Sequence, residues 1–349
     1  MDPTTFAAAA AAADEDAFDA ELAAFLAPDE TAAALLARTF VEPLRTGLPL
    51  IDRFTSFRGG QLLELAGPAG CGRTTALLQV AVTCILPELA NGVPYGGRGG
   101  HVLFYDLDGK LDIVRLMEML DCRINAAQVA ARVAVPEELP VIQDCLTRFH
   151  VVRCASSFEL LASLRTVRPL LDQLAASPGG LACLLLDNVA AFHWLDRAAR
   201  GPRAGSGGGH LGPPPGDFAA EGAPLSQYRV HAAVAAELRL LQQLYRLPVI
   251  ASKHTLLTAG SSGWGSESKP HQQQHGGADL WAHRDTMLKP WQDLVTHRLL
   301  LRTDEQQGSG SSRGGQAGGT STVRLARWLL PDDPTVICFH VSDAGIHLQ

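Results

Sequence analysis

A glycine-rich segment, GPAGCGRTT, carries the clearest chemistry in the sequence. It fits the phosphate-loop pattern G-x-x-x-x-G-K-[ST] except that arginine stands at the lysine position. In such a loop, glycines let successive backbone N–H groups turn toward a phosphate, and the N-terminus of the following helix adds partial positive charge. The segment predicts a nucleotide site formed by consecutive residues: Gly67, Pro68, Ala69, Gly70, Cys71, Gly72, Arg73, Thr74 and Thr75.

Arg73 is the departure from the pattern. Lysine is a compact charge on a thin stem, whereas the guanidinium group is planar and bulkier and makes fork-like contacts. We therefore expect phosphate contact at Arg73 with a geometry that differs from that of lysine. The alternative interpretation is a glycine-rich turn between a strand and a helix that holds no nucleotide.

Acidic residues that end two apolar runs could complete the site. Asp187 ends LACLLLD, where a carboxylate can hold Mg²⁺ together with the hydroxyl of Thr74. Asp106 and Asp108 end HVLFYDLD, and either one could polarise an attacking water as a general base. The alternative for this pair is an Asp-rich turn into the next helix, with Asp108 or Asp112 favoured by the helix dipole.

Short apolar runs alternate with helical patterns along the chain, and the runs are nearly continuous in apolar character, as in strands buried on both faces. Strands are predicted at 61–67, 101–107, 148–154, 181–187, 247–252, 297–303, 322–328 and 335–341. Helices are predicted at 73–86, 110–121, 156–176 and 225–246. This alternation predicts an α/β fold with a mostly parallel, twisted sheet flanked by helices.

Three stretches rich in Gly, Ser or Gln interrupt this pattern at about 200–224, 258–278 and 304–320. Their composition is typical of flexible surface loops. An acidic, Ala-rich segment occupies residues 1–45. We therefore expect an N-terminal segment of residues 1–45 followed by one domain, 46–349, with three flexible insertions.

Charge and composition limit the classes of function. The net charge is -7 and the pI about 5.9, so the chain lacks the basic field that dominates sequence-independent DNA affinity. Contact with DNA would need a local patch or a partner. No apolar stretch reaches the 18 or so residues that cross a bilayer. The seven cysteines include no C-x-x-C pair, which is typical of a protein whose thiols are reduced. We expect a soluble protein that is not secreted.

Several segments, taken in order, resemble the core motifs of RecA-type recombinases: TGLPLID, GGQLLELAGPAGCGRTT, VLFYDLDG, LLLDNVAAF and PVIASKHT. Further segments resemble one paralog group of the eukaryotic strand-exchange recombinase: CILPE, LDIVRL, CLTRFHVVRCASSFELL, LLLDNVAAFHWLDR and KPWQDLVTHRLLL. Together they extend from about Thr46 to Leu301.

This resemblance implies a RecA-like P-loop NTPase core, an αβα sandwich that binds ATP and Mg²⁺. It also implies a nuclear protein of homologous recombination that acts at double-strand breaks and crosslinks. The implied partners are other recombinase paralogs in a heteromeric complex, the strand-exchange recombinase, and single-stranded or branched DNA reached through the complex. No membrane partner is implied.

Three positions depart from the active members of the family that the chain resembles. Asp108 stands where they have the catalytic glutamate, and His254 stands where they have the glutamine that senses the γ-phosphate. Arg73 replaces the lysine. Together these changes favour an assembly subunit with weak or no ATP hydrolysis. The alternative is an active DNA-dependent ATPase with strand-exchange activity of its own.

Two further groups of residues have competing interpretations. His271, His275 and His283 could bind a metal, although a solvated loop fits their low-complexity surroundings better. Trp264, Trp281 and Trp291 could stack on single-stranded bases. The alternative is that Trp281 and Trp291 anchor the core or a partner interface, which we expect for Trp291.

The segment AAALLARTF at 32–40 predicts a short helix with an apolar face ahead of the domain. In proteins of the family it resembles, the segment before the core docks on a neighbouring subunit. The helix is therefore a candidate partner surface. The alternative is a helix that packs on its own domain.

Overall fold

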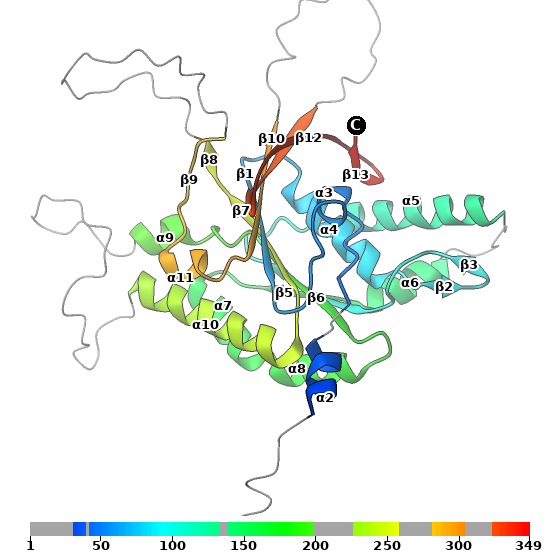
Figure 1. Cartoon of the computed structure of the whole chain (residues 1–349), viewed down its shortest axis with the longest axis horizontal. Coiled ribbons are helices and arrows are strands. Elements are labelled where there is room, and N and C mark those ends of the chain that lie inside the picture. The colour runs from blue at the N-terminus through cyan, green and yellow to red at the C-terminus, as the bar shows by residue number, and fades with distance from the viewer. Residues whose placement is uncertain (1–30, 40–41, 133–138, 199–225, 258–280, 304–322) are drawn as a thin grey trace, which may run out of the picture. The chain divides into compact units, whose positions relative to one another are not determined.

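A computed structural model describes residues 31–39, 42–132, 139–198, 226–257, 281–303 and 323–349 (Figure 1). The three predicted insertions, most of the N-terminal segment, and Trp264, His271 and His275 lie outside these ranges. The chain divides into two units, Met1–Glu42 and Pro43–Gln349. In the first unit, helix α2 (Ala32–Thr39) forms where the sequence predicts it.

The described part of the second unit contains a nine-stranded sheet in the order β13-β12-β11-β10-β1-β7-β6-β4-β5. Six neighbouring strands are parallel: β10 (His297–Thr303), β1 (Leu62–Gly67), β7 (Val249–His254), β6 (Leu181–Asp187), β4 (His101–Asp106) and β5 (Phe149–Arg153). Three antiparallel strands extend the β10 edge: β11 (Arg324–Leu330), β12 (Asp332–Ser342) and β13 (Gly345–Leu348). The mostly parallel sheet is confirmed.

Helices cover both faces of the sheet (Figure 1). Helices α4 (Arg73–Ile85), α5 (Ile113–Ala131) and α6 (Leu139–Thr147) share one hydrophobic cluster with the sheet. Helices α7 (Ser157–Thr166), α8 (Arg168–Ala176) and α10 (Gln227–Tyr245) share the other. In β4, Val102 belongs to the first cluster and Leu103 to the second, because successive side chains point to opposite faces. This is why the strands are apolar throughout.

Two helix predictions were wrong in their limits. The helix predicted at 156–176 is two helices, because Pro169 in the first turn of α8 lacks the N–H that a continuous helix needs. The helix predicted at 110–121 begins only at Ile113, where the side chain of Asp112 caps it, and runs on to Ala131.

Short elements that the sequence did not predict complete the described fold. Besides α6 and β13, they are α3 (Pro49–Asp52), α9 (His193–Ala198), α11 (Lys289–Gln292) and two ribbons, β2–β3 (Leu89–Ala90 with Val93–Pro94) and β8–β9 (Leu256–Leu257 with His283–Arg284). None of the helices in the described part of the chain has the length and apolar character that a membrane span requires.

A buried group of charges joins the three central strands. Glu64 on β1 and Lys253 on β7 are fully buried, and Lys253 Nζ lies 2.7 Å from Glu64 Oε1. Arg298 on β10 lies 2.6 Å from the same oxygen, and both cations also contact Asp285, at 3.0 and 3.1 Å. Burial opposes ionisation of Asp285, but the charge and hydrogen bond of Lys253, the backbone N–H of Met287 and the charge of Arg298 together lower its pKa. The network therefore keeps its buried charges compensated.

Trp291 on α11 completes this network. Its ring is buried, and its Nε1–H donates to Glu64 Oε2 at 2.7 Å. The expectation that Trp291 anchors the core is confirmed.

Lys253→Met should lower the free energy of unfolding by about 3 kcal/mol, because the substitution leaves buried carboxylates undercompensated. A matched control is Lys289→Met. Its ion pair with Asp293 is exposed, and its loss should cost about 0.5 kcal/mol or less. Urea denaturation of both variants measures the difference, and equal costs would show that the buried network adds nothing to stability.

Candidate functional site

The phosphate loop connects β1 to α4. Strand β1 ends at Gly67, and α4 begins at Arg73 with Gly72 as its N-cap. Gly70 and Gly72 have φ angles of 76° and 101°, in the region that L side chains rarely adopt. The loop therefore needs glycine at these two positions for its backbone conformation.

Gly67 is required for a different reason, which is space. A Cβ atom at Gly67 would lie 2.5 Å from the carbonyl oxygen of Leu301 and 2.6 Å from Cys71 Sγ. Cys71 is itself buried, and burial raises the pKa of its thiol against the opposing effect of Arg73. Cys71 thus fills space inside the loop as a neutral thiol.

Thr74 and Asp187 meet beside the loop. The Thr74 hydroxyl donates to Asp187 Oδ2 at 2.8 Å, and Ser252 on β7 donates to Asp187 Oδ1. Burial raises the pKa of Asp187, the two hydrogen bonds oppose that shift, the charge of Asp108 adds to it and the charge of Arg73 counters it. The structure thus brings the predicted magnesium ligands together, and it adds Ser252, which the sequence analysis did not identify.

The acidic residues after β4 have separate positions. Asp106 is buried and accepts from the backbone N–H groups of Lys110, at 3.0 Å, and Leu111, at 3.4 Å, so it holds the turn. Asp112 caps α5. Of the three, Asp106 and Asp112 thus have the structural roles that the turn interpretation expected.

Asp108 lies near Asp187 and His254, which end β6 and β7. Its charge acts on the pKa values of both Asp187 and His254. Asp108 Oδ2 pairs with Lys110 Nζ at 3.0 Å, while Oδ1 is buried without a hydrogen-bond partner among the described residues. One oxygen of Asp108 is thus engaged by Lys110, and its role as a general base stays a prediction.

His254 ends β7 next to the loop. Burial lowers its pKa, and the positive charges of Arg73 and Lys110 lower it further, so the imidazole is neutral at pH 7. Its backbone N–H donates to Asn188 Oδ1 at 3.0 Å, and that oxygen also accepts from the N–H of Ala190. Asn188 was missed by the sequence analysis; its signal was a polar residue directly after an apolar strand.

The arrangement fits a nucleotide phosphate with Mg²⁺. Arg73 Nη1 is buried and has no hydrogen-bond partner among the described residues, so it offers a donor to an anion. Thr74 and Asp187 supply two oxygen ligands of the kind that Mg²⁺ prefers. The other predicted residues, Pro68, Ala69 and Thr75, lie in the loop and the first turn of α4.

The remaining candidates in the described part of the chain are His283 and Trp281. His283 Nδ1 lies 3.2 Å from the Trp281 carbonyl oxygen, and the described residues contain no group of three or more His, Cys, Asp or Glu arranged for a metal ion. The guanidinium of Arg302 lies 6.0 Å from the Trp281 ring centre. Base stacking by Trp281 stays a prediction.

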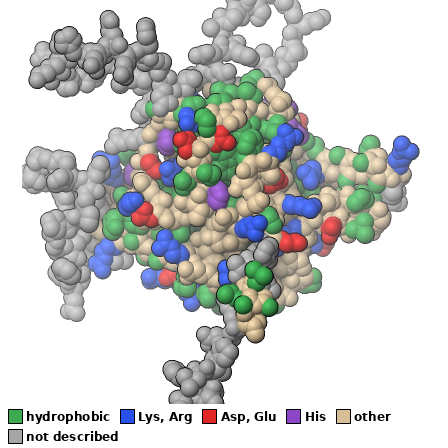
Figure 2. All heavy atoms as spheres, viewed as in Figure 1, with side chains coloured by type: hydrophobic (Ala, Val, Ile, Leu, Met, Phe, Trp, Pro, Cys, Tyr) green, Lys and Arg blue, Asp and Glu red, His purple; other side chains and the backbone are tan. Residues whose placement is uncertain are grey.

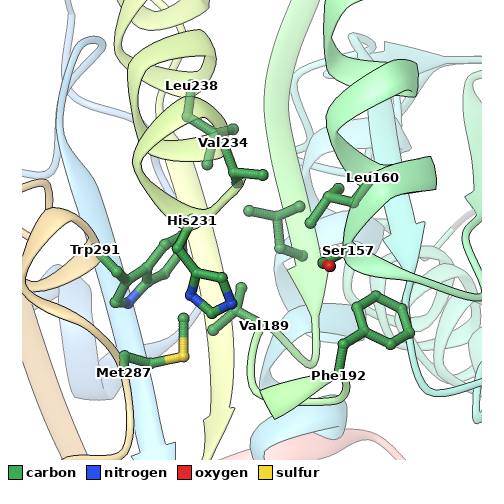
Figure 3. A pocket seen from close by; sticks show the side chains of 10 residues that line it. Ser157, Leu160, Val189, Phe192, His231, Val234, Leu238, Met287 and Trp291 are labelled. Carbon is green, nitrogen blue, oxygen red and sulfur yellow. The ribbon is translucent and has the colours of Figure 1, made fainter. Parts of the chain in front are cut away.

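A mostly apolar pocket lies on the α7–α10 side of the sheet (Figure 3). Its walls include Phe192, Met287 and Trp291, with His231 and Ser157 as polar members. No residue of the phosphate loop lines it. On the face drawn in Figure 2, Lys and Arg side chains are scattered among acidic and apolar ones, so that face has no single basic field.

Comparison with known proteins shows which proteins the chain resembles. No family model matches it. It is 28% identical to the DNA repair protein XRCC2 homolog of Arabidopsis thaliana over 93% of the chain and 90% of that protein. It is also 28% identical to the DNA repair protein XRCC2 of Mus musculus, over 71% of the chain and 74% of that protein.

A third similarity covers about half of the chain. The DNA repair and recombination protein RadA of Methanoculleus marisnigri is 29% identical over 48% of the chain and 48% of that protein. The mostly parallel sheet and the phosphate loop are consistent with these similarities to recombination proteins. The chain thus resembles XRCC2 proteins over most of its length and a RadA recombinase over about half of it.

Proposed function

We propose that this protein acts in homologous-recombination repair of DNA, as a nuclear subunit of a recombinase-paralog complex. In that role it supports assembly of the strand-exchange filament at double-strand breaks and crosslinks, with weak or no ATP hydrolysis. One observation carries the proposal. The phosphate loop has its positive-φ glycines and Thr74 lies against Asp187, which supports nucleotide binding, whereas Arg73, Asp108 and His254 differ from the active family pattern.

Nucleotide binding is the first part of the proposal. The backbone of residues 67–75 would hold the phosphates of ATP, and Thr74 and Asp187 would hold Mg²⁺. The bound metal would neutralise phosphate charge. Arg73 would contribute a fixed positive charge that cannot be deprotonated in a protein.

Weak hydrolysis is the second part. The carboxylate of Asp108 is one methylene shorter than that of glutamate, and Lys110 Nζ already lies 3.0 Å from one of its oxygens. A general base needs to reach the water it activates, so both features reduce its effect. The neutral His254 ring offers a single N–H donor where the active family members have an amide.

Assembly with partners is the third part. Helix α2 supports it, because Leu35 and Leu36 are 46% and 58% exposed. Exposed apolar side chains close together mark interaction surfaces. Other recombinase paralogs and the strand-exchange recombinase are the proposed partners. Because the net charge of the protein is -7, we propose that it reaches single-stranded or branched DNA through the complex.

ATP with Mg²⁺ should raise the melting temperature of the isolated chain, because a ligand that binds only the native state stabilises it. Thr74→Ala should abolish that shift, since it removes a magnesium ligand. Thr166→Ala, which removes an exposed hydroxyl on α7, is the matched control and should keep the shift. A folded wild-type chain without any shift would contradict nucleotide binding.

Turnover of ATP in the presence of single-stranded DNA should not differ measurably between the wild-type chain and Asp187→Asn. The reason is that Arg73, Asp108 and His254 leave little hydrolysis to lose. Phosphate release at saturating ATP measures this. DNA-stimulated turnover that Asp187→Asn abolishes would instead establish the alternative, an active DNA-dependent ATPase.

Leu36→Asp should weaken co-purification with a co-expressed recombinase paralog, by about thirtyfold in affinity if Leu36 anchors the interface. Leu244→Asp on α10 is the matched control, because Leu244 is equally exposed, at 57%. Unchanged affinity for Leu36→Asp would show that α2 is not the docking surface. The partners' dissociation constants, measured by biolayer interferometry, give the comparison.

A further inference from the structure

The antiparallel strands at the end of the chain contact the phosphate loop at two points. Arg324, the first residue of β11, donates from Nε to the carbonyl oxygen of Gly70 at 3.2 Å. On β12, Val341 lies 3.2 Å from the position that a Cβ atom on Gly72 would take. Strands β11 and β12 pair with each other, with Arg324 opposite Phe339. Two paired strands of the sheet therefore approach both positive-φ glycines of the loop.

The contact from Arg324 acts on a peptide group of the loop. The carbonyl of Gly70 and the N–H of Cys71 belong to the same peptide group. A positively charged guanidinium beside the carbonyl oxygen therefore increases the dipole of that peptide group. Hydrogen-bonded groups polarise one another in this way, and charge-assisted bonds are roughly twice as strong as neutral ones. In phosphate loops the backbone N–H groups are the donors to phosphate.

From this geometry we infer that Arg324 is a positioning residue for phosphate. It fixes the turn at Gly70 and makes the N–H of Cys71 a stronger donor. The inference rests on the proposed nucleotide binding.

The charge of Arg324 has a particular use in this chain. The lysine of the phosphate loop is replaced by Arg73, whose bulkier group makes a different contact. Asp108 and Asp187 both lie near the loop and repel phosphate. The guanidinium of Arg324, bound to the carbonyl oxygen of Gly70, offsets part of that repulsion without taking up space in the site.

Arg324 also has a close comparison on its own strand. Arg327 lies on β11 three positions further along. Its guanidinium contacts Asp332 Oδ1 at 3.1 Å and the carbonyl oxygen of Asp333, away from the loop. Arg327→Gln therefore removes the same charge from the protein as Arg324→Gln but keeps the contact between Arg324 and Gly70.

The test measures the dissociation constants of fluorescent N-methylanthraniloyl ADP and ATP, each with Mg²⁺, for full-length variants. Arg324→Gln keeps a neutral donor, Arg324→Lys keeps the charge, and Arg327→Gln is the control. We expect Arg324→Gln to weaken binding of both nucleotides about tenfold, Arg324→Lys to recover most of the loss, and Arg327→Gln to change binding less than about twofold. Melting temperatures without nucleotide should be equal for the two Gln variants.

Two results would overturn the role of Arg324 while nucleotide binding stands. One is wild-type affinity for Arg324→Gln. The other is an equal loss of nucleotide affinity for Arg324→Gln and Arg324→Lys, which would show that the shape of the arginine side chain matters and its charge does not. If the wild-type chain binds neither nucleotide, the proposed nucleotide function falls together with the inference. If Arg324→Gln does not fold, the comparison of Arg324→Lys with the wild type and Arg327→Gln decides, and a tenfold loss for Arg324→Lys would contradict the role of charge.

Discussion

Compensation of buried charge on the central strands is the constraint on which the site depends. Glu64, Lys253 and Arg298 come from the adjacent strands β1, β7 and β10, and two of the three side chains are fully buried. Each of these buried charges would lower the stability of the fold if it lacked its partners, so the charges favour the placement of these strands side by side. Asp285 and Trp291 join the same network from the segment before β10. The strands that bear the phosphate loop and His254 are thus held beside each other.

Convergence of strand ends then creates the site. The carboxyl ends of parallel strands meet at one edge of a sheet, which is where α/β proteins bind their ligands. Here β1 leads into the phosphate loop, β6 ends at Asp187 and β7 carries Ser252 and His254. The glycines of the loop and the Thr74–Asp187 pair match the phosphate-loop pattern, whereas Arg73, Asp108 and His254 differ from the active family pattern. This difference is the reason for proposing an assembly subunit instead of an independent enzyme.

The antiparallel end of the sheet belongs to the same site. Strands β11 and β12 approach the glycines of the phosphate loop, and Gln79 on α4 hydrogen-bonds the backbone of Gly47 and of Ile346 on β13. The helix that follows the phosphate loop is thus tied both to the segment before β1 and to the last strand. These strands therefore stabilise the position of the loop as well as extending the sheet.

The sequence alone determined the α/β class, the places of the main strands, the phosphate loop and its pairing with Asp187, because these depend on local pattern: periodicity, glycine spacing and a carboxylate after an apolar run. Only the tertiary structure separated the roles of Asp106 and Asp108, added Ser252 and Asn188, and brought Arg324 to Gly70. Those contacts join residues on different strands or depend on how a turn folds. Their partners are set by strand order and register, which no local pattern of residue types specifies.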